Sequence, residues 1–102
     1  MITMETIRRE LNDIKYYYAR QEQFDRAFDS IGKNEILRTV EKYNRAVCAA
    51  EPKLYEVYVC LYIECHTHDR TATVLNYSEN YIYKTNKKLV EFFYKELNKE
   101  AA

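Results

Sequence analysis

Polar and basic side chains gather near the start of the last helical segment, where they could contact nucleic acid. That segment begins near Glu79, and at about 100° per residue one sector of its surface carries Asn80, Tyr83, Lys84 and Lys87. Asn can pair with adenine, Lys can reach guanine or phosphate, and Tyr can reach phosphate or a thymine methyl group. We therefore expect this sector to contact base edges or the backbone in a major groove.

Three neighbouring side chains could add contacts to phosphate. Ser78 precedes the sector, Lys88 follows it, and His68 lies in the connection before the preceding helix. Hydroxyl, ammonium and imidazole groups all donate hydrogen bonds to phosphate oxygens. The alternative for the same sector is an ordinary solvated surface or a face that docks on another protein, because Lys, Asn and Glu are common on both.

Other chemistry finds little support in the sequence. Cys65, His66 and His68 could suggest a zinc site, but structural zinc usually takes four ligands from two separated pairs, and the sequence offers no second pair. No glycine-rich phosphate loop or nucleophile motif is present, and the acidic residues are dispersed among lysines. We expect no enzyme activity, no cofactor and no metal.

Length and composition favour one all-α domain. The chain has 102 residues, 16 basic and 16 acidic residues, 11 Tyr, 4 Phe, and a single Gly and Pro, which is typical of about five helices with short connections. The three cysteines, Cys48, Cys60 and Cys65, lie in helical patterns, so we expect reduced thiols. No apolar run of about 18 residues or signal-peptide core occurs, and we expect a cytoplasmic protein.

The N-terminal half is expected to form two helices. Apolar residues recur at helical spacing from Thr3 to about Ile31, which favours one long helix over two helices with a kink. Gly32 then suits the end of that helix, and Asn34 can cap the next. That second helix is expected to run until the only proline, Pro52.

A strongly apolar helix should follow and lie at the centre of the core. Pro52 suits the first turn of a helix. The segment 54–65, LYEVYVCLYIEC, has only Glu56 and Glu64 as charged residues. A helix that is apolar nearly all round should be surrounded by other helices.

The last two helices are separated by about three residues. Thr67 can cap the first of them, and Asn76 can leave it through the left-handed region. Tyr77 can fill the corner, and Ser78 can cap a long final helix that begins at Glu79. This spacing is typical of a helix-turn-helix.

The stretch THDRTATVLNYSENYIYK, residues 67–84, resembles the helix-turn-helix of sigma-factor region four and is most similar to small phage regulators of the ArpU and RinA types. The positions that fit the pattern are Ala72, Asn76, Tyr77, Ser78 and Ile82. The apolar segment 54–63 matches the helix before the motif, so the resemblance covers about residues 51–97. Thr71 and Thr85 stand where the pattern has larger apolar residues, which could loosen packing by about 1 kcal/mol each.

The resemblance implies a transcription regulator of phage or mobile-element origin that binds double-stranded DNA and could also contact RNA polymerase. Residues 1–31 could form a homodimer, because the stripe of the first helix is wide and three consecutive tyrosines, residues 16–18, cannot share one helix face. Two copies would read two half-sites. The rival interpretations are a protein-interaction module that keeps a degenerate motif and a small DNA-packaging subunit.

Overall fold

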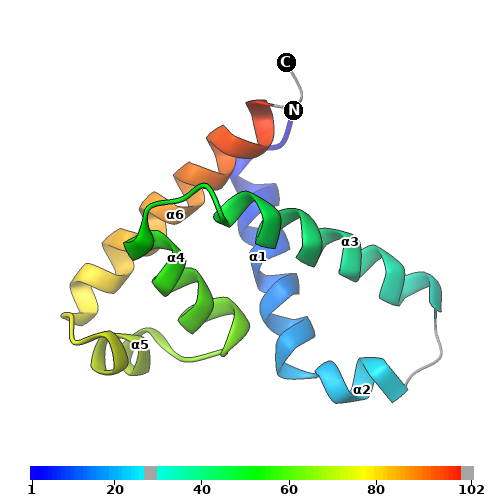
Figure 1. The fold of residues 1–102 in the computed structure, drawn as a ribbon, viewed down its shortest axis with the longest axis horizontal. Coiled ribbons are helices and arrows are strands. Elements are labelled where there is room, and N and C mark those ends of the chain that lie inside the picture. Colours follow the sequence, from blue (N-terminus) through cyan, green and yellow to red (C-terminus); the bar gives the residue numbers. More distant parts are fainter. Residues whose placement is uncertain (27–29, 100–102) are drawn as a thin grey trace.

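The computed structural model describes the backbone of residues 1–26 and 30–99 and the side chains of residues 1–23 and 35–99. Within these residues the chain forms six α-helices and one π-helical turn and has no strand, which confirms the all-α prediction with one helix more than expected (Figure 1). The elements are α1 (Met4–Ala19), α2 (Gln21–Arg26), α3 (Ser30–Val47), α4 (Pro52–Tyr58), η1 (Val59–Ile63), α5 (His68–Leu75) and α6 (Glu79–Lys99).

The prediction of one long N-terminal helix is wrong. Helix α1 ends at Ala19, and Arg20 leaves the helical region with φ −126° and ψ 28° while its N–H donates to the carbonyls of Tyr16 and Tyr17. The short helix α2 follows at once. The break falls at the start of the polar stretch 19–23, where no continuous apolar stripe holds the two segments on one line.

Gly32 does not end a helix, and Asn34 does not cap one, so both predictions are wrong. Helix α3 begins at Ser30 and continues through both positions, and no glycine in the described residues has a positive φ. A glycine in a helix costs about 1 kcal/mol relative to alanine, which the remaining length of α3 can offset. The residues between α2 and α3, numbers 27–29, lie outside the described part.

The helices spread from a shared upper corner, where the two ends of the described chain meet (Figure 1). Ile2 donates its N–H to Asn98 Oδ1 at 2.8 Å, and Asn98 Nδ2 donates to the Ile2 carbonyl at 3.0 Å. From that corner α1 and α6 diverge, and α4 and η1 lie between them. The start of α6 therefore projects at the far end from the corner, next to α5.

Aromatic rings join the helices at the centre of the core. Phe93 of α6 is fully buried and meets Tyr43 of α3 and Tyr58 of α4 edge to face, with ring centroids 4.9 and 5.6 Å apart. The Tyr43 hydroxyl donates to Glu10 of α1 at 2.7 Å, so the buried polar group is satisfied. Burial first and Glu10 second raise the pKa of Tyr43 above its usual range, so this phenol stays protonated.

The apolar segment 54–65 takes its expected central place but is not one regular helix. Pro52 opens α4 as predicted, and the chain then widens into the π-helical η1, whose Leu61 and Tyr62 are buried. The expectation that other helices surround it is wrong on one side, because Tyr55 is 45 % exposed. Helices α1 and α6 cover the other side.

The three consecutive tyrosines of α1 diverge as their spacing requires. Tyr17 is buried in the core, Tyr18 lies partly buried against it, and Tyr16 is 51 % exposed. The three rings therefore do not share one face of the helix, as predicted. Within the described residues, no helix combines the length and hydropathy that a membrane crossing needs.

Candidate nucleic-acid interface

The connection between α5 and α6 follows the local rules that its residues predict. Thr67 Oγ1 accepts from the Arg70 N–H at 3.0 Å at the start of α5, which confirms this cap. Asn76 leaves the helix with φ 61° and ψ 45°, in the left-handed region, as predicted. The N–H of Tyr77 then reaches back to the Ala72 carbonyl at 2.9 Å. Three residues therefore fix α5 and α6 relative to each other.

Ser78 begins α6 as predicted. Its Oγ accepts a hydrogen bond from the Tyr81 N–H at 3.1 Å, so the hydroxyl oxygen is used as a helix cap. The residue is exposed, and its O–H proton is still available to donate. Ser78 can therefore cap α6 and contact a phosphate at the same time.

The predicted polar sector of α6 is exposed over its whole length. Its members are Asn80, Tyr83, Lys84 and Lys87, and Lys88, which follows the sector, is exposed as well. The opposite sector is buried and comprises Ile82, Thr85, Leu89, Val90 and Phe93. The exposure of the polar sector predicted from helical periodicity is therefore confirmed, and Lys88 adjoins its four side chains near the start of the helix.

His68 is half-buried and stacks on Tyr83, whereas the sequence suggested a histidine free to approach phosphate. The two rings are nearly parallel, with an interplanar angle of 8° and centroids 4.2 Å apart. Burial, followed by the charge of Lys15, lowers the pKa of His68, and Glu79 acts in the opposite direction. The neutral imidazole therefore serves as a support for Tyr83, which is itself 54 % exposed.

The orientation of α6 is fixed from beneath by polar contacts. The Tyr62 hydroxyl of η1 donates to Asn86 Oδ1 at 2.6 Å. On the adjoining side, Thr85 Oγ1 donates to the Tyr81 carbonyl at 2.7 Å within α6. The Thr85 bond satisfies a buried hydroxyl within the helix, whereas the contact from Tyr62, together with the buried sector, holds the exposed sector in one rotational position.

Thr71 and Thr85 are both buried where α5 and α6 meet, and they differ in hydrogen bonding. Thr85 has its carbonyl partner within α6. The Thr71 hydroxyl is fully buried and has no hydrogen-bond partner among the described residues. A buried hydroxyl without a partner costs about 1–3 kcal/mol, so Thr71 is the weaker of the two positions.

We expect Thr71→Val to stabilise the protein by about 1 kcal/mol, because the valine methyl fills the same space without a buried unpaired hydroxyl. The measurement is urea unfolding followed by circular dichroism. Thr85→Val is the matched control: it removes a satisfied hydroxyl, so its stability should stay unchanged or fall. A destabilised Thr71→Val variant would mean that this hydroxyl has a partner in solution.

The other side chains that could do chemistry are acidic groups, histidines and cysteines outside the α6 sector. In the part of the chain that the structure describes, no group of three His, Cys, Asp or Glu residues could hold a metal ion. Burial raises the pKa of Cys60 and of Cys65, which disfavours a reactive thiolate at either position. These thiols are therefore poor candidates for nucleophiles.

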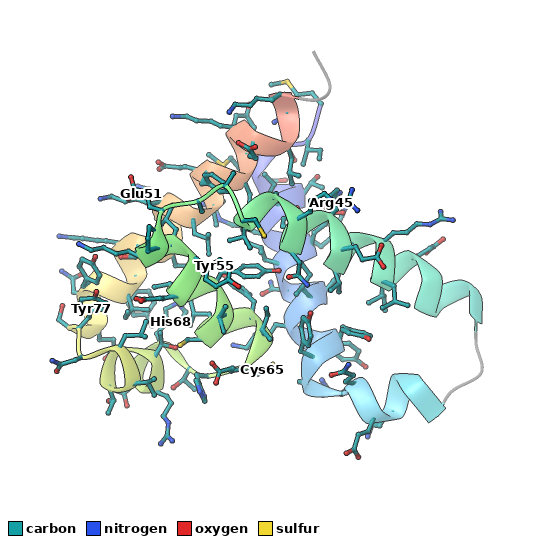
Figure 2. The ribbon with its side chains drawn as sticks, in the orientation of Figure 1. Arg45, Glu51, Tyr55, Cys65, His68 and Tyr77 are labelled. Atoms are coloured by element: carbon teal, nitrogen blue, oxygen red, sulfur yellow. The ribbon has the colours of Figure 1, made fainter. Side chains whose placement is uncertain are left out.

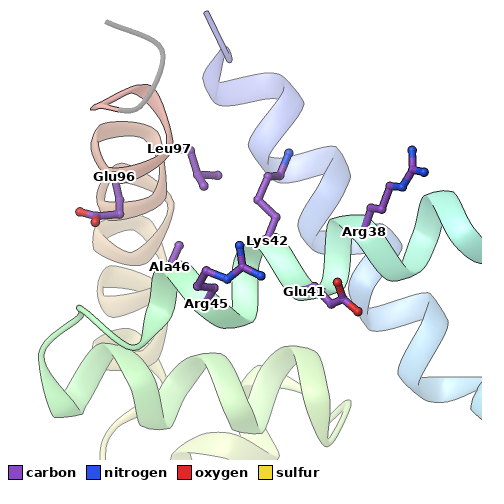
Figure 3. A pocket seen from close by; sticks show the side chains of 7 residues that line it. All are labelled: Arg38, Glu41, Lys42, Arg45, Ala46, Glu96 and Leu97. Atoms are coloured by element: carbon purple, nitrogen blue, oxygen red, sulfur yellow. The ribbon is translucent and has the colours of Figure 1, made fainter.

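One open pocket of about 290 Å³ lies between α3 and the end of α6 (Figure 3). Its basic side chains are Arg38, Lys42 and Arg45, and two carboxylates, Glu41 and Glu96, share its lining. The Lys42 ammonium is already paired with a carboxylate of α1 at 3.3 Å. In Figure 3 the cationic side chains point in different directions, so the pocket lacks a convergent binding centre.

Helical periodicity did not predict that Lys15 of α1 lies near His68. Lys15 lies close enough to His68 for its charge to lower the pKa of the imidazole. Residues 15 and 68 are far apart in the chain, and periodicity within α1 indicates only that Lys15 is off the buried stripe. Only the packing of α1 beside η1 brings it near His68.

The chain matches no family model, and comparisons with curated proteins and with solved structures give no match either.

Proposed function

We propose that this protein is a sequence-specific DNA-binding transcription regulator that reads the major groove with α6. The observation that carries the proposal is the exposed sector at the start of α6, with Asn80, Tyr83, Lys84 and Lys87, on a helix joined to α5 by three residues. An α-helix fits the width of the major groove, and Asn and Lys supply the donors and acceptors that base edges require.

The charge distribution supports this proposal although the chain is neutral overall. Lys84, Lys87 and Lys88 lie on one exposed surface, and within the described residues none of them forms an ion pair. DNA affinity depends on local neutralisation of phosphates and does not require a basic protein. Three adjacent unpaired ammonium groups can each neutralise a phosphate at this surface.

The biological setting follows from the sequence resemblance and is part of the proposal. A regulator of the sigma region-four type from a phage or mobile element would act on late genes and could contact RNA polymerase. A homodimer through the N-terminal part would place two copies of α6 on half-sites about 34 Å apart. The dimer surface would lie within residues 1–31, of which the side chains of residues 24–31 lie outside the described part.

A protein-interaction module is the second candidate, and one observation favours it. The Tyr83 ring is half-exposed and held in place by its stack on His68. A rigid exposed aromatic side chain is typical of protein-binding hot spots. Such a module would present the same α6 surface to RNA polymerase or to a phage-assembly component, and a DNA-packaging subunit would combine both contacts.

Salt dependence of DNA binding tests the proposal directly. Fluorescence anisotropy with a mixed pool of short duplexes should show binding. The slope of the logarithm of affinity against the logarithm of salt concentration should be about −2.7 or steeper, because each of three neutralised phosphates contributes about −0.9. The same pool, once it binds, can be used to select the preferred sequence. No binding at low salt, or a slope near zero, would reject the DNA-binding function and direct the search to protein partners.

A further inference from the structure

Helix α1 is fastened beside the connection that leads into α5. The Cys65 thiol donates to the Lys15 carbonyl at 3.3 Å. Cys65 itself has φ 60°, so the chain turns sharply here between η1 and α5. Figure 2 shows Cys65 and His68 on the side of the molecule where η1 ends. The middle of α1 is thereby held next to the start of α5.

The chain of contacts continues from α1 to the exposed surface of α6. His68 follows Cys65 by three residues, responds to the Lys15 charge, and stacks on Tyr83 of α6. The part of α1 that carries Lys15 is thus linked through Cys65 to the segment whose His68 packs on the α6 surface. The Lys15 side chain is partly exposed, and it makes no ion pair with any residue in the described ranges.

Arg8 is a second basic residue of α1. It precedes Lys15 by seven residues, so both project from one side of α1. Burial raises the pKa of Tyr62, and the nearby Arg8 charge opposes that rise. Helix α1, which carries Arg8, packs on both η1 and α6, and Tyr62 of η1 bonds Asn86 of α6. The Arg8 side chain is exposed and, among the described residues, has no ion-pair partner.

We propose that α1 forms a second phosphate-binding element, in which Arg8 and Lys15 contact the DNA backbone beside the groove that α6 enters. This inference rests on the proposed DNA-binding function and adds a named element to it. Two cations along one helix can follow a phosphate strand, since guanidinium and ammonium groups both bind phosphate oxygens. The contacts are to the backbone, so they strengthen binding without selecting a sequence.

The test measures DNA binding of a double variant, Arg8→Gln with Lys15→Gln, and of the wild-type protein. Loss of two phosphate contacts should reduce the salt slope by about 1.8 and lower affinity by a similar factor for every duplex in the pool. The matched control is Arg38→Gln with Arg45→Gln, two exposed cations of α3 with the same spacing. Figure 2 shows Arg45 well away from His68, so this control should bind as the wild type does.

A second measurement checks the position of Lys15 without DNA. In Lys15→Gln, the pKa of His68 measured by NMR titration should rise, because a nearby positive charge that disfavours the imidazolium ion has been removed. An unchanged His68 titration would overturn the proposal by placing Lys15 elsewhere.

The outcomes separate this inference from the proposed function. If the wild type binds, and the Arg8 and Lys15 variant keeps the full salt slope, α1 is not part of the interface and the role of α6 is unaffected. If the wild type fails to bind DNA at low salt, the proposed DNA-binding function is rejected, and the proposed phosphate-binding role of α1 is rejected with it.

Discussion

A variant that carries Lys84→Ala and Lys87→Ala is expected to lose DNA affinity by about 30-fold to several hundredfold while it keeps its fold. Each ammonium contact to a guanine or a phosphate contributes on the order of 1–2 kcal/mol, and 1.4 kcal/mol is a tenfold change in affinity. Both side chains are exposed on α6, so their removal leaves the core intact. The measurement is anisotropy at several salt concentrations, with circular dichroism to record helicity.

The matched control removes the same charge from the same helix. Lys95→Ala with Lys99→Ala changes two exposed lysines at the other end of α6, at least about 12 Å along the axis at 1.5 Å per residue. Lys99 pairs with Glu96 on the surface, and such a pair contributes little to stability. Equal loss of binding in both variants would show a non-specific charge effect, and loss of helicity in the first would show that Lys84 and Lys87 are structural.

Phe93→Ala should destabilise the protein by about 3–5 kcal/mol, the range for truncating a buried aromatic residue. Phe93 is fully buried and contacts rings from α3 and α4, so the cavity would open where three helices meet. A domain of this size has about 5–15 kcal/mol of total stability. The variant should therefore unfold at a much lower temperature, which thermal unfolding followed by circular dichroism will measure.

Tyr55→Ala provides the comparison for Phe93→Ala. It also removes an aromatic ring, but one that is 45 % exposed on α4, so its effect on the free energy of unfolding should be much smaller. Equal destabilisation by the two substitutions would contradict the placement of Phe93 at the centre of the core. Such a result would require a different packing of α6 on α3 and α4.

Local signals predicted the elements around the candidate interface because each depends on neighbouring residues only. Thr67 and Ser78 cap their own helices, and Asn76 adopts the left-handed conformation that few other residues tolerate. Pro52 opens α4 for the same kind of local reason. Helical periodicity then assigned the exposed sector of α6 correctly.

Local signals failed where competing structures differ little in energy. The single glycine, Gly32, favours a helix end by itself, but α3 continues through it because one unfavourable position is offset by the rest of a helix. The polar residues after Ala19 allowed either a continuous or a broken helix, and the structure breaks there. The π-helical turn η1 likewise has no distinct sequence pattern.

The sequence alone thus determined the all-α class, the caps and the turn before α6, and the polar surface near the start of that helix, since these follow from short-range backbone chemistry and helical spacing. Tertiary structure alone decided that His68 supports Tyr83 and that the Lys15 carbonyl of α1 accepts from Cys65, three residues before His68. Those placements join residues distant in the chain, and they depend on how α1, η1 and α5 pack, which no local pattern encodes.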